Sequence, residues 1–217
     1  EPRPLLPASL EDRLLGWLLK VVGFALVLMA LAGWLSLMTW SASDPSLTHA
    51  TSGTTRNIFG PVGAIFSDLI LQTIGFAAVF AFLGPAWAGA EMMLTERLRR
   101  FKTRSAVFAV ALAVLAGALS SLPPPATWPL NHGLGGALGD LVFGILGGAA
   151  ALFLPGISAA LAGLVLFAGG MSLLSAALGL GSREIALLAR SRNLERRSLA
   201  VPPPYPDSDA EEGEASP

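Results

Sequence analysis

Two aspartates are the residues of this chain best placed to do chemistry. Asp68 and Asp140 lie at the edges of long apolar segments, where an ionised carboxylate is costly unless it has a role. Inside a membrane they would be candidate proton or ion ligands. At the outer start of a helix, an aspartate instead stabilises the free backbone N–H groups and the positive helix end. We favour this capping or interfacial role, and the ion-ligand interpretation is the alternative.

Residue types that usually carry catalysis or bind metals are sparse. Ser158 weakly resembles the serine motif of intramembrane proteases, but it needs a histidine base, and His49 and His132 both lie in expected outer loops. Neither histidine has Asp or Glu residues clustered beside it in the sequence, and the chain has no cysteine. We therefore expect no catalytic residue and no metal site.

Nucleotide binding is not expected in these 217 residues either. A phosphate-binding loop has the pattern G-x-x-x-x-G-K-[ST], and neither Lys20 nor Lys102 follows such a glycine-rich loop. The glycines between 133 and 136 lack the strand and the acidic partner of a dinucleotide site. The sequence thus predicts no cofactor and no enzymatic activity for this piece.

Small residues at four-residue spacing form a second kind of candidate site. Ala109, Ala113 and Gly117 make one stripe, and it predicts a packing face because small side chains let helices approach closely in lipid. Two further pairs have the G-x-x-x-G spacing, namely Gly135 with Gly139 and Gly144 with Gly148. For these pairs, contact between subunits and packing within one chain are equal alternatives.

The composition places these residues in a membrane protein. Apolar residues make up 53% of the chain and charged residues 13%, with a mean hydropathy of +0.63. The net charge of −1 gives no overall basic footprint for nucleic acid. The fold class that follows is an all-α, polytopic integral membrane protein.

Positive charge indicates how the chain is oriented. Of the 14 Lys and Arg residues, all except Arg56 fall in three patches. The patches are Arg3, Arg13 and Lys20; Arg97, Arg99, Arg100, Lys102 and Arg104; and Arg183, Arg190, Arg192, Arg196 and Arg197. Basic residues near span ends stay on the cytoplasmic side, so both termini are predicted to be inside.

Four transmembrane helices in two hairpins satisfy this pattern. The expected spans are residues 21 to 38, preceded by a helical turn or two from 14 to 19, then 60 to 90, 105 to 122 and 157 to 180. Pro85 predicts a kink in the second span. Residues 41 to 57 and 123 to 132 are the outer loops, and residues 96 to 104 are the inner loop.

One apolar segment does not fit a simple four-span count. Residues 141 to 180 carry no charge and are long enough for two spans, but five spans would put the last arginine patch outside. We therefore expect residues 135 to 154 to form an interfacial or re-entrant helix that ends at Pro155 and Gly156.

An internal repeat supports two hairpins of the same orientation. At a constant offset of 72 residues, six identities align two helix starts. Gly63, Asp68, Leu69, Gly75, Ala77 and Ala78 correspond to Gly135, Asp140, Leu141, Gly147, Ala149 and Ala150. The outer helix-start positions are accordingly Gly63 and Asp68 in the first hairpin, and Gly135 and Asp140 in the second.

The remaining segments flank this membrane domain. We expect a cytoplasmic tail over residues 1 to 13, the membrane domain over 14 to 181, a basic juxtamembrane helix over 182 to 200, and a Pro-rich, acidic, disordered linker over 201 to 217. Because the chain begins at Glu1 rather than Met, we expect it to be a piece of a longer protein.

Several stretches, in order, give the chain a family resemblance. They are residues 40 to 46 (Trp-Ser-Ala-Ser-Asp-Pro-Ser), Asn57, residues 60 to 64 (Gly-Pro-Val-Gly-Ala), residues 68 to 72 with Gly75, residues 128 to 130 (Trp-Pro-Leu), residues 133 to 136 and residues 139 to 140. Together they cover about residues 14 to 181, which resemble the four-span N-terminal region of FtsK/SpoIIIE-type DNA translocases. The chain departs from that pattern in its long apolar segment before the last span.

The resemblance implies a function for the longer protein. This piece would anchor a motor in the bacterial inner membrane at the division septum, help to recruit and stabilise the division machinery, and favour homo-oligomers, with six copies if they match a hexameric motor. The ATP- and Mg-dependent RecA-like motor and a DNA-reading winged-helix module would follow the linker. Chromosomal DNA would be a partner only through that motor. A small transporter or channel is the alternative, for which the hairpins and the two aspartates are the positive features.

Overall fold

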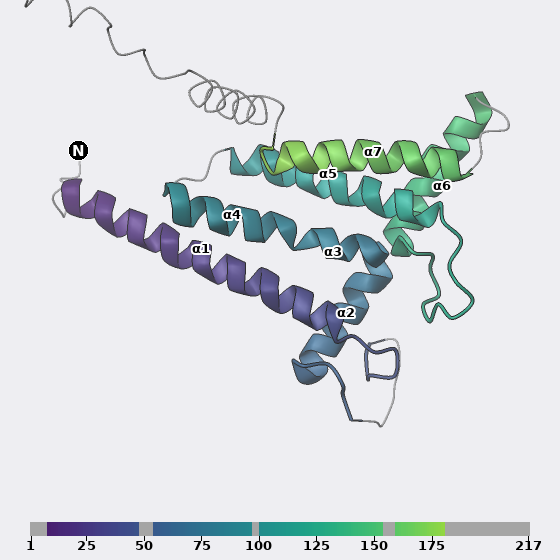
Figure 1. Ribbon diagram of the computed structural model, residues 1–217, viewed down its shortest axis with the longest axis horizontal. Helices are drawn as coiled ribbons and strands as arrows, with labels where there is room; N and C mark the ends of the chain where they lie inside the picture. Colours follow the sequence, from purple (N-terminus) through teal and green to yellow (C-terminus); the bar gives the residue numbers. More distant parts are fainter. Residues whose placement is uncertain (1–7, 48–53, 97–99, 154–158, 181–217) are drawn as a thin grey trace, which may run out of the picture. The chain divides into compact units, whose positions relative to one another are not determined.

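All regular secondary structure in the described part of the first compact unit is helical (Figure 1). The computed structural model describes residues 8–47, 54–96, 100–153 and 159–180, and residues 1–179 form one unit and 180–217 another. The helices are α1 (Ala8–Met38), α2 (Gly60–Ile74), the 3-10 turn η1 (Gly75–Ala77), α3 (Ala78–Ala81), α4 (Leu83–Thr95), α5 (Phe101–Ser120), α6 (Gly136–Phe153) and α7 (Ala159–Ala177). No strand occurs in the described ranges, which agrees with the all-α prediction.

Four helical stretches of the described residues are long and apolar enough to cross a bilayer. They are Arg13–Met38, Gly60–Thr95, Phe101–Ser120 and Ala159–Ala177, and the second of them comprises α2 to α4. Large apolar side chains cover their outer faces, such as Trp17, which is 72% exposed, and Leu94, which is 84% exposed. A bilayer covers such surface, and the prediction of a polytopic protein with four transmembrane helices is confirmed.

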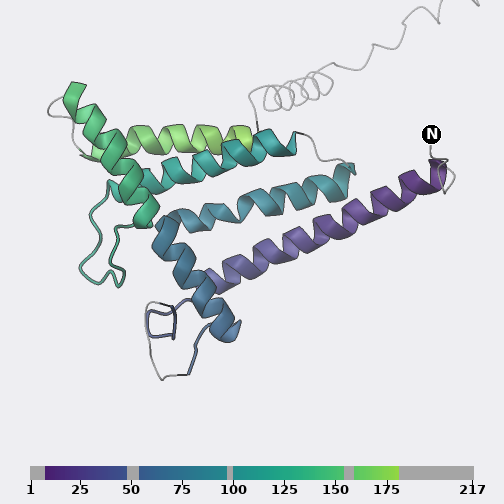
Figure 2. The ribbon, with the colours of Figure 1, turned by 180° about the vertical axis from the view of Figure 1, so that it is seen from behind.

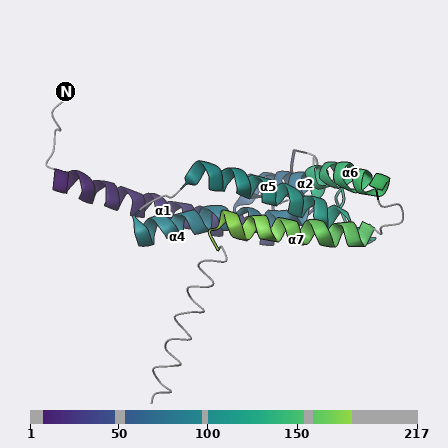
Figure 3. The same ribbon diagram turned by 90° about the horizontal axis from the view of Figure 1, so that it is seen from above.

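The spans pair as two hairpins. α1 packs along α4 and α5 packs along α7, and the first helix of each hairpin runs opposite to the second (Figures 1 and 2). Each hairpin has the same order of parts, with a long helix, a polar loop, an oblique helix (α2 or α6) and a returning span. α2 and α6 also contact each other, where the end of α2 meets the start of α6 (Figures 2 and 3). This order matches the one that the internal repeat predicted.

Small residues seven positions apart line the contacts within the hairpins. In α1 they are Gly16, Gly23 and Ala30, and in α7 they are Gly163, Gly170 and Ala177, all of them buried. At Gly23, an added Cβ would lie 2.6 Å from the carbonyl oxygen of Gly89 in α4. Seven-residue spacing keeps one face of a helix against its partner along the whole length of a left-handed pair.

The second span is broken, and the main break is not the one that Pro85 predicted. Gly75 has a φ of +57° and ends α2, after which η1 and α3 lead into α4 in another direction (Figures 1 and 2). The Phe76 N–H donates to the Leu134 carbonyl at 2.9 Å instead of continuing the helix. Pro85 has a smaller effect, because its missing N–H leaves the Ala81 carbonyl without its helical partner, and α3 ends at that residue.

Two predicted boundaries also shift. α1 begins at Ala8, inside the expected tail of residues 1 to 13, and α5 begins at Phe101 rather than at residue 105. In both places the helix extends beyond the uncharged apolar run that predicted the span, and charged residues occupy that extension. Long basic side chains can extend to water from such positions, so charge does not end the helix.

α6 is a helix of its own, separate from α7. It covers nearly the segment 135 to 154 that was expected to be interfacial or re-entrant, and it packs against α5 and α2. Its depth in the membrane remains a prediction. The proposed break at Pro155 and Gly156 lies outside the described residues, as do the basic helix of residues 182 to 200 and the linker beyond it.

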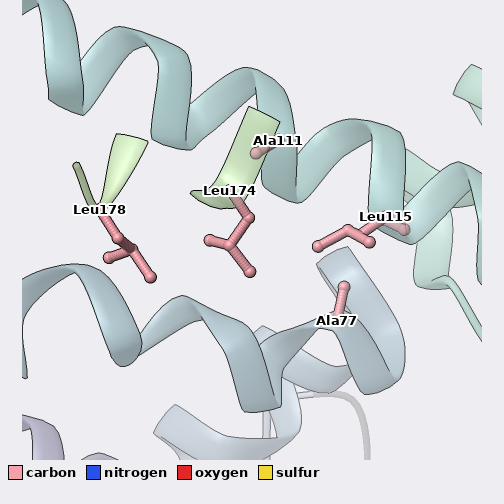
Figure 4. Packing of buried hydrophobic residues seen from close by; sticks show 6 residues of the cluster. Ala77, Ala111, Leu115, Leu174 and Leu178 are labelled. Atoms are coloured by element: carbon pink, nitrogen blue, oxygen red, sulfur yellow. The ribbon is translucent and has the colours of Figure 1, made fainter. Parts of the chain in front are cut away.

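The central core is small and lies where η1 meets α5 and α7. It contains Ala77, Ala111, Leu115, Ala116, Leu174 and Leu178, all less than 10% exposed. Leu115 and Leu174 point into the space beside Ala77 (Figure 4). The small side chains of η1 and α5 thus let the broken second span reach the second hairpin.

Candidate functional site

The first outer loop is closed by a buried carboxylate. Asp44 is 3% exposed, and its two oxygens accept the backbone N–H groups of Arg56 at 2.9 Å and Asn57 at 3.0 Å. These bonds join the beginning of the loop to its end. Because a carboxylate in this position accepts two charge-assisted bonds, it fixes the loop rather than offering a reactive group.

Asn57 connects this loop to both neighbouring helices. Its amide donates to the carbonyl of Ser36 in α1 at 2.8 Å, and its Oδ1 accepts the N–H of Phe59 at 3.1 Å. The Ser36 hydroxyl in turn donates to the Gly63 carbonyl in α2 at 2.9 Å. Any Cβ at Gly63 would overlap the Asn57 amide, so this glycine is required for the close approach. The buried Ser67 hydroxyl also donates to the Gly63 carbonyl, at 2.7 Å. We call Ser36, Asp44, Asn57, Gly63 and Ser67 the outer clamp.

The second outer loop is held by Asp140. Its carboxylate accepts the hydroxyl of Ser120 at 2.7 Å and the N–H of Gly133 at 3.2 Å, and it lies 3.4 Å from His132 Nδ1. Trp128 closes the loop through a bond from its indole N–H to the His132 carbonyl at 2.7 Å. Asp140 therefore joins the end of α5 to the segment that leads into α6.

The prediction that the two aspartates cap α2 and α6 is wrong, and the interfacial role that was predicted with it stays a prediction. Neither α2 nor α6 has an acidic residue in its first turn. Asp68 lies in the middle of α2, is 5% exposed and accepts a bond from the Gln72 amide one turn later at 2.8 Å. Of the four predicted helix-start positions, Gly63 lies in the first turn of α2 and Gly135 directly precedes α6.

At the opposite end of the spans, an ion pair joins the two hairpins. Arg104 of α5 donates from Nη1 to Glu91 of α4 at 2.6 Å and from Nε to the carbonyl of Ala177 in α7 at 2.7 Å. Both charged side chains are largely buried, with 22% and 16% of their surface exposed. The carbonyls at the end of α7 carry partial negative charge, so the arginine is stabilised from two sides.

The predicted four-residue stripe on α5 is only partly a packing face. Gly117 is buried, and a Cβ there would lie 2.7 Å from Val142 of α6. Ala113 is half-buried, but Ala109 is exposed, so the stripe does not face one partner along its length. The buried positions of α5 are instead Ala111 and the run from 115 to 118, because α7 and α6 contact it on adjacent sides.

The two glycine pairs of α6 have different surroundings. Gly135 and Gly139 lie against the Ala116 carbonyl and the Ser120 hydroxyl of α5, which places this pair in contacts within the chain. Gly144 and Gly148 have open space where a Cβ would be, and both are exposed. A subunit contact for the second pair remains a prediction.

In the described ranges, no group of three or more His, Asp or Glu side chains could hold a metal ion. Ser158 and His49, the residues of the weak protease resemblance, lie outside these ranges. His132 is described, and it packs against Asp140 in the second outer loop.

The sequence was compared with known protein families and proteins. The family model for the "4TM region of DNA translocase FtsK/SpoIIIE" matches residues 17–184. This chain belongs to the FtsK/SpoIIIE 4TM family. A protein of Bradyrhizobium diazoefficiens named DNA translocase FtsK is 35% identical over 181 residues, which are 82% of this chain. Proteins of the same name from Mesorhizobium japonicum and Agrobacterium fabrum are 40% and 37% identical over 59% and 58% of it.

These FtsK proteins are much longer than the present chain. The chain spans 22% of the Bradyrhizobium protein and 14% of the other two. No solved structure matches the chain.

The FtsK/SpoIIIE resemblance rests on residues that the fold brings together. Asp44, Asn57 and Gly63, which come from three of its separate stretches, meet in the outer clamp. Gly75 and the segment Leu134–Gly136 belong to two further stretches of the resemblance, and their backbones are in contact. The family pattern therefore marks the outer loops and the break in the second span.

Sequence reasoning missed Ser36, Ser67 and the Glu91–Arg104 pair. A serine inside an apolar span is a usable signal, because its hydroxyl needs an acceptor in lipid and a neighbouring helix can supply one. Arg104 was counted only as part of a basic patch. Its pairing with Glu91 depends on how the hairpins pack, which no local pattern shows.

Proposed function

We propose that this domain anchors a DNA translocase in the bacterial inner membrane and places it at the division septum. The observation that carries the proposal is the overlap of the family match with the membrane spans. Residues 17–184 contain all four candidate spans except the first turn of the span that begins at Arg13. The relatives bear the name DNA translocase, and most of their length lies outside the matched region. The family match does not favour the transporter or channel alternative.

In this proposal the domain supplies location and not chemistry. The sequence lacks a phosphate-binding loop, so ATP and Mg would bind to a motor elsewhere in the longer protein. We place both termini on the cytoplasmic side, because the three basic patches favour that orientation. The motor and the DNA it moves would then be on the same side as residue 217.

Self-association and contact with other division proteins complete the proposal. A hexameric motor implies six anchors, and the exposed Gly144 and Gly148 of α6 offer a surface of small residues for contact between copies. The FtsK/SpoIIIE resemblance supports binding to other division proteins.

A deletion experiment can separate septal placement from ATP hydrolysis. A version of the longer protein without residues 1 to 181 should retain DNA-stimulated ATP hydrolysis in solution but should lose its septal placement in cells. Residues 1 to 217 alone should bind no ATP. Retained septal placement of the truncated protein would contradict the proposal.

A further inference from the structure

A cavity of about 520 Å³ lies between the two hairpins, at the basic end of the spans. All four spans line it, with Leu26 from α1, Trp87 from α4, Phe108 from α5 and Ala177 from α7 among its walls. Glu91, Arg104 and Ser105 are its polar members, and the rest of the lining is apolar. The volume is within the range of roughly 300–1,000 Å³ that small-molecule sites occupy.

An apolar cavity of this size in a membrane protein needs an apolar occupant. Atoms that line an empty space lose dispersion contacts, and a lipid chain from the surrounding bilayer can restore them. The cavity extends to the end of α4, at Met92, and to the start of α5, at Phe101, where we expect the spans to approach the membrane surface. A hydrocarbon chain inside it would therefore carry its headgroup at the level of Arg100 and the start of α5.

The charged residues at the end of α4 and the start of α5 select the headgroup. Glu91 is neutralised by Arg104, and Glu96 is neutralised by Lys20 at 2.7 Å. Arg100 and Lys102 are exposed, and neither makes an ion pair within the described part of the chain. Both residues adjoin Phe101, which belongs to the cavity wall, so unpaired positive charge lies next to the cavity. Basic pockets between spans are typical of sites for anionic lipid headgroups.

We infer that this cavity is a binding site for an anionic phospholipid, with one acyl chain between the hairpins and the phosphate on Arg100 and Lys102. Two protein segments could also fill the cavity, namely a second copy of the chain or the C-terminal part of this chain. The positive charge beside the cavity argues against both. A second copy of the chain would bring the same basic loop to the site, and residues 183 to 197 of this chain would add five arginines. Like charges at one position repel each other, whereas a phospholipid neutralises them.

Native mass spectrometry of the full chain in detergent measures the bound lipid. Phosphatidylglycerol and phosphatidylcholine with identical acyl chains are offered at equal concentration. We expect phosphatidylglycerol to be retained about twenty-five-fold more strongly, because each Lys or Arg near an anionic headgroup contributes roughly a fivefold factor. The double variant Arg100→Gln/Lys102→Gln should lose this preference, and Arg13→Gln, an exposed basic residue outside the cavity, should keep it.

A second pair of variants tests the cavity itself. Ala88→Phe places a ring in the cavity from α4 and should reduce phosphatidylglycerol occupancy several-fold, whereas Ala109→Phe adds the same ring on the exposed side of α5 and should not. Helical circular dichroism checks the fold, and Val22→Phe fills the same cavity from α1 if Ala88→Phe does not fold.

Three results would overturn the inference. One is equal retention of the two lipids by the unaltered chain. Another is unchanged occupancy in folded Ala88→Phe or Val22→Phe. The third is a dimer that dissociates when the cavity is filled, since the occupant would then be a second copy.

Discussion

Single polar residues in this domain hold backbone in place. The outer clamp uses Asp44 and Asn57 to fasten a loop to the ends of α1 and α2, and Asp140 does the same for the second loop. In the described residues, no buried side-chain nitrogen or oxygen lacks a partner. Since satisfied groups of this kind stabilise a structure, changes at these positions should act on stability first.

Asn57→Ala tests the outer clamp. The substitution removes the donor to the Ser36 carbonyl and the acceptor for the Phe59 N–H, so it should lower the free energy of unfolding by about 1–3 kcal/mol. Thermal unfolding of the purified chain in detergent measures the change. Asn131→Ala is the matched control, because Asn131 is exposed in the other outer loop and its loss should alter stability by less than about 0.5 kcal/mol. Equal effects of the two substitutions would contradict the clamp.

Arg104→Met tests the ion pair between the hairpins. It leaves the largely buried Glu91 without its partner and should cost about 1–3 kcal/mol of stability. Adding Glu91→Met should recover part of this loss, because an unpaired buried charge is worse than none. Lys20→Met breaks an exposed pair with Glu96 and should cost less than about 1 kcal/mol. A double variant that is no more stable than Arg104→Met alone would argue against coupling of the two residues.

At the level of helices, the sequence predicted the positions of the spans, but it predicted the contacts between them only in part. Uncharged apolar runs of adequate length revealed the four spans, and prolines and polar residues revealed the outer loops. The four-residue stripe from Ala109 to Gly117 was misleading, because α5 contacts α7 and α6 on different sides. The seven-residue spacing of Gly16, Gly23 and Ala30 was readable in the sequence but was not used.

The break at Gly75 could not be predicted from the sequence for a different reason. Its φ of +57° suits glycine, but a glycine inside an apolar run does not itself indicate a turn. The turn is fixed by the bond from the Phe76 N–H to Leu134, about sixty residues later in the chain. The same holds for the Glu91–Arg104 pair. Features of this sort depend on the packing of the hairpins and cannot be found from local patterns.

Two adjacent glycines of α7 allow a matched test of the seven-residue face. Gly170→Leu would place a side chain 2.8 Å from Leu115 and should cost about 1–3 kcal/mol through overpacking. Gly169→Leu points into open space and should leave stability nearly unchanged. Thermal unfolding of both variants in detergent measures the difference. If the two behave alike, α7 does not pack through this face.

For the whole molecule, orientation follows from charge and can be tested with single cysteines. The chain contains none, so a cysteine can be introduced at Thr48, Thr103, Thr127 or Ser198 and probed with an impermeant thiol reagent in intact spheroplasts. Thr48 and Thr127 should be labelled, and Thr103 and Ser198 should be protected, because we expect the basic patches to keep their segments inside. Labelling at Ser198 would show five spans and an outside C-terminus.

Septal placement is the central claim for the whole molecule. The most direct measurement is fluorescence microscopy of residues 1 to 217 fused to a fluorescent protein in dividing bacteria. An anchor that contains its own targeting information should collect at midcell without the motor, and a matched fusion carrying an unrelated four-span domain should spread over the membrane. Uniform membrane fluorescence of residues 1 to 217, in cells whose septa form normally, would contradict the septal-anchor account.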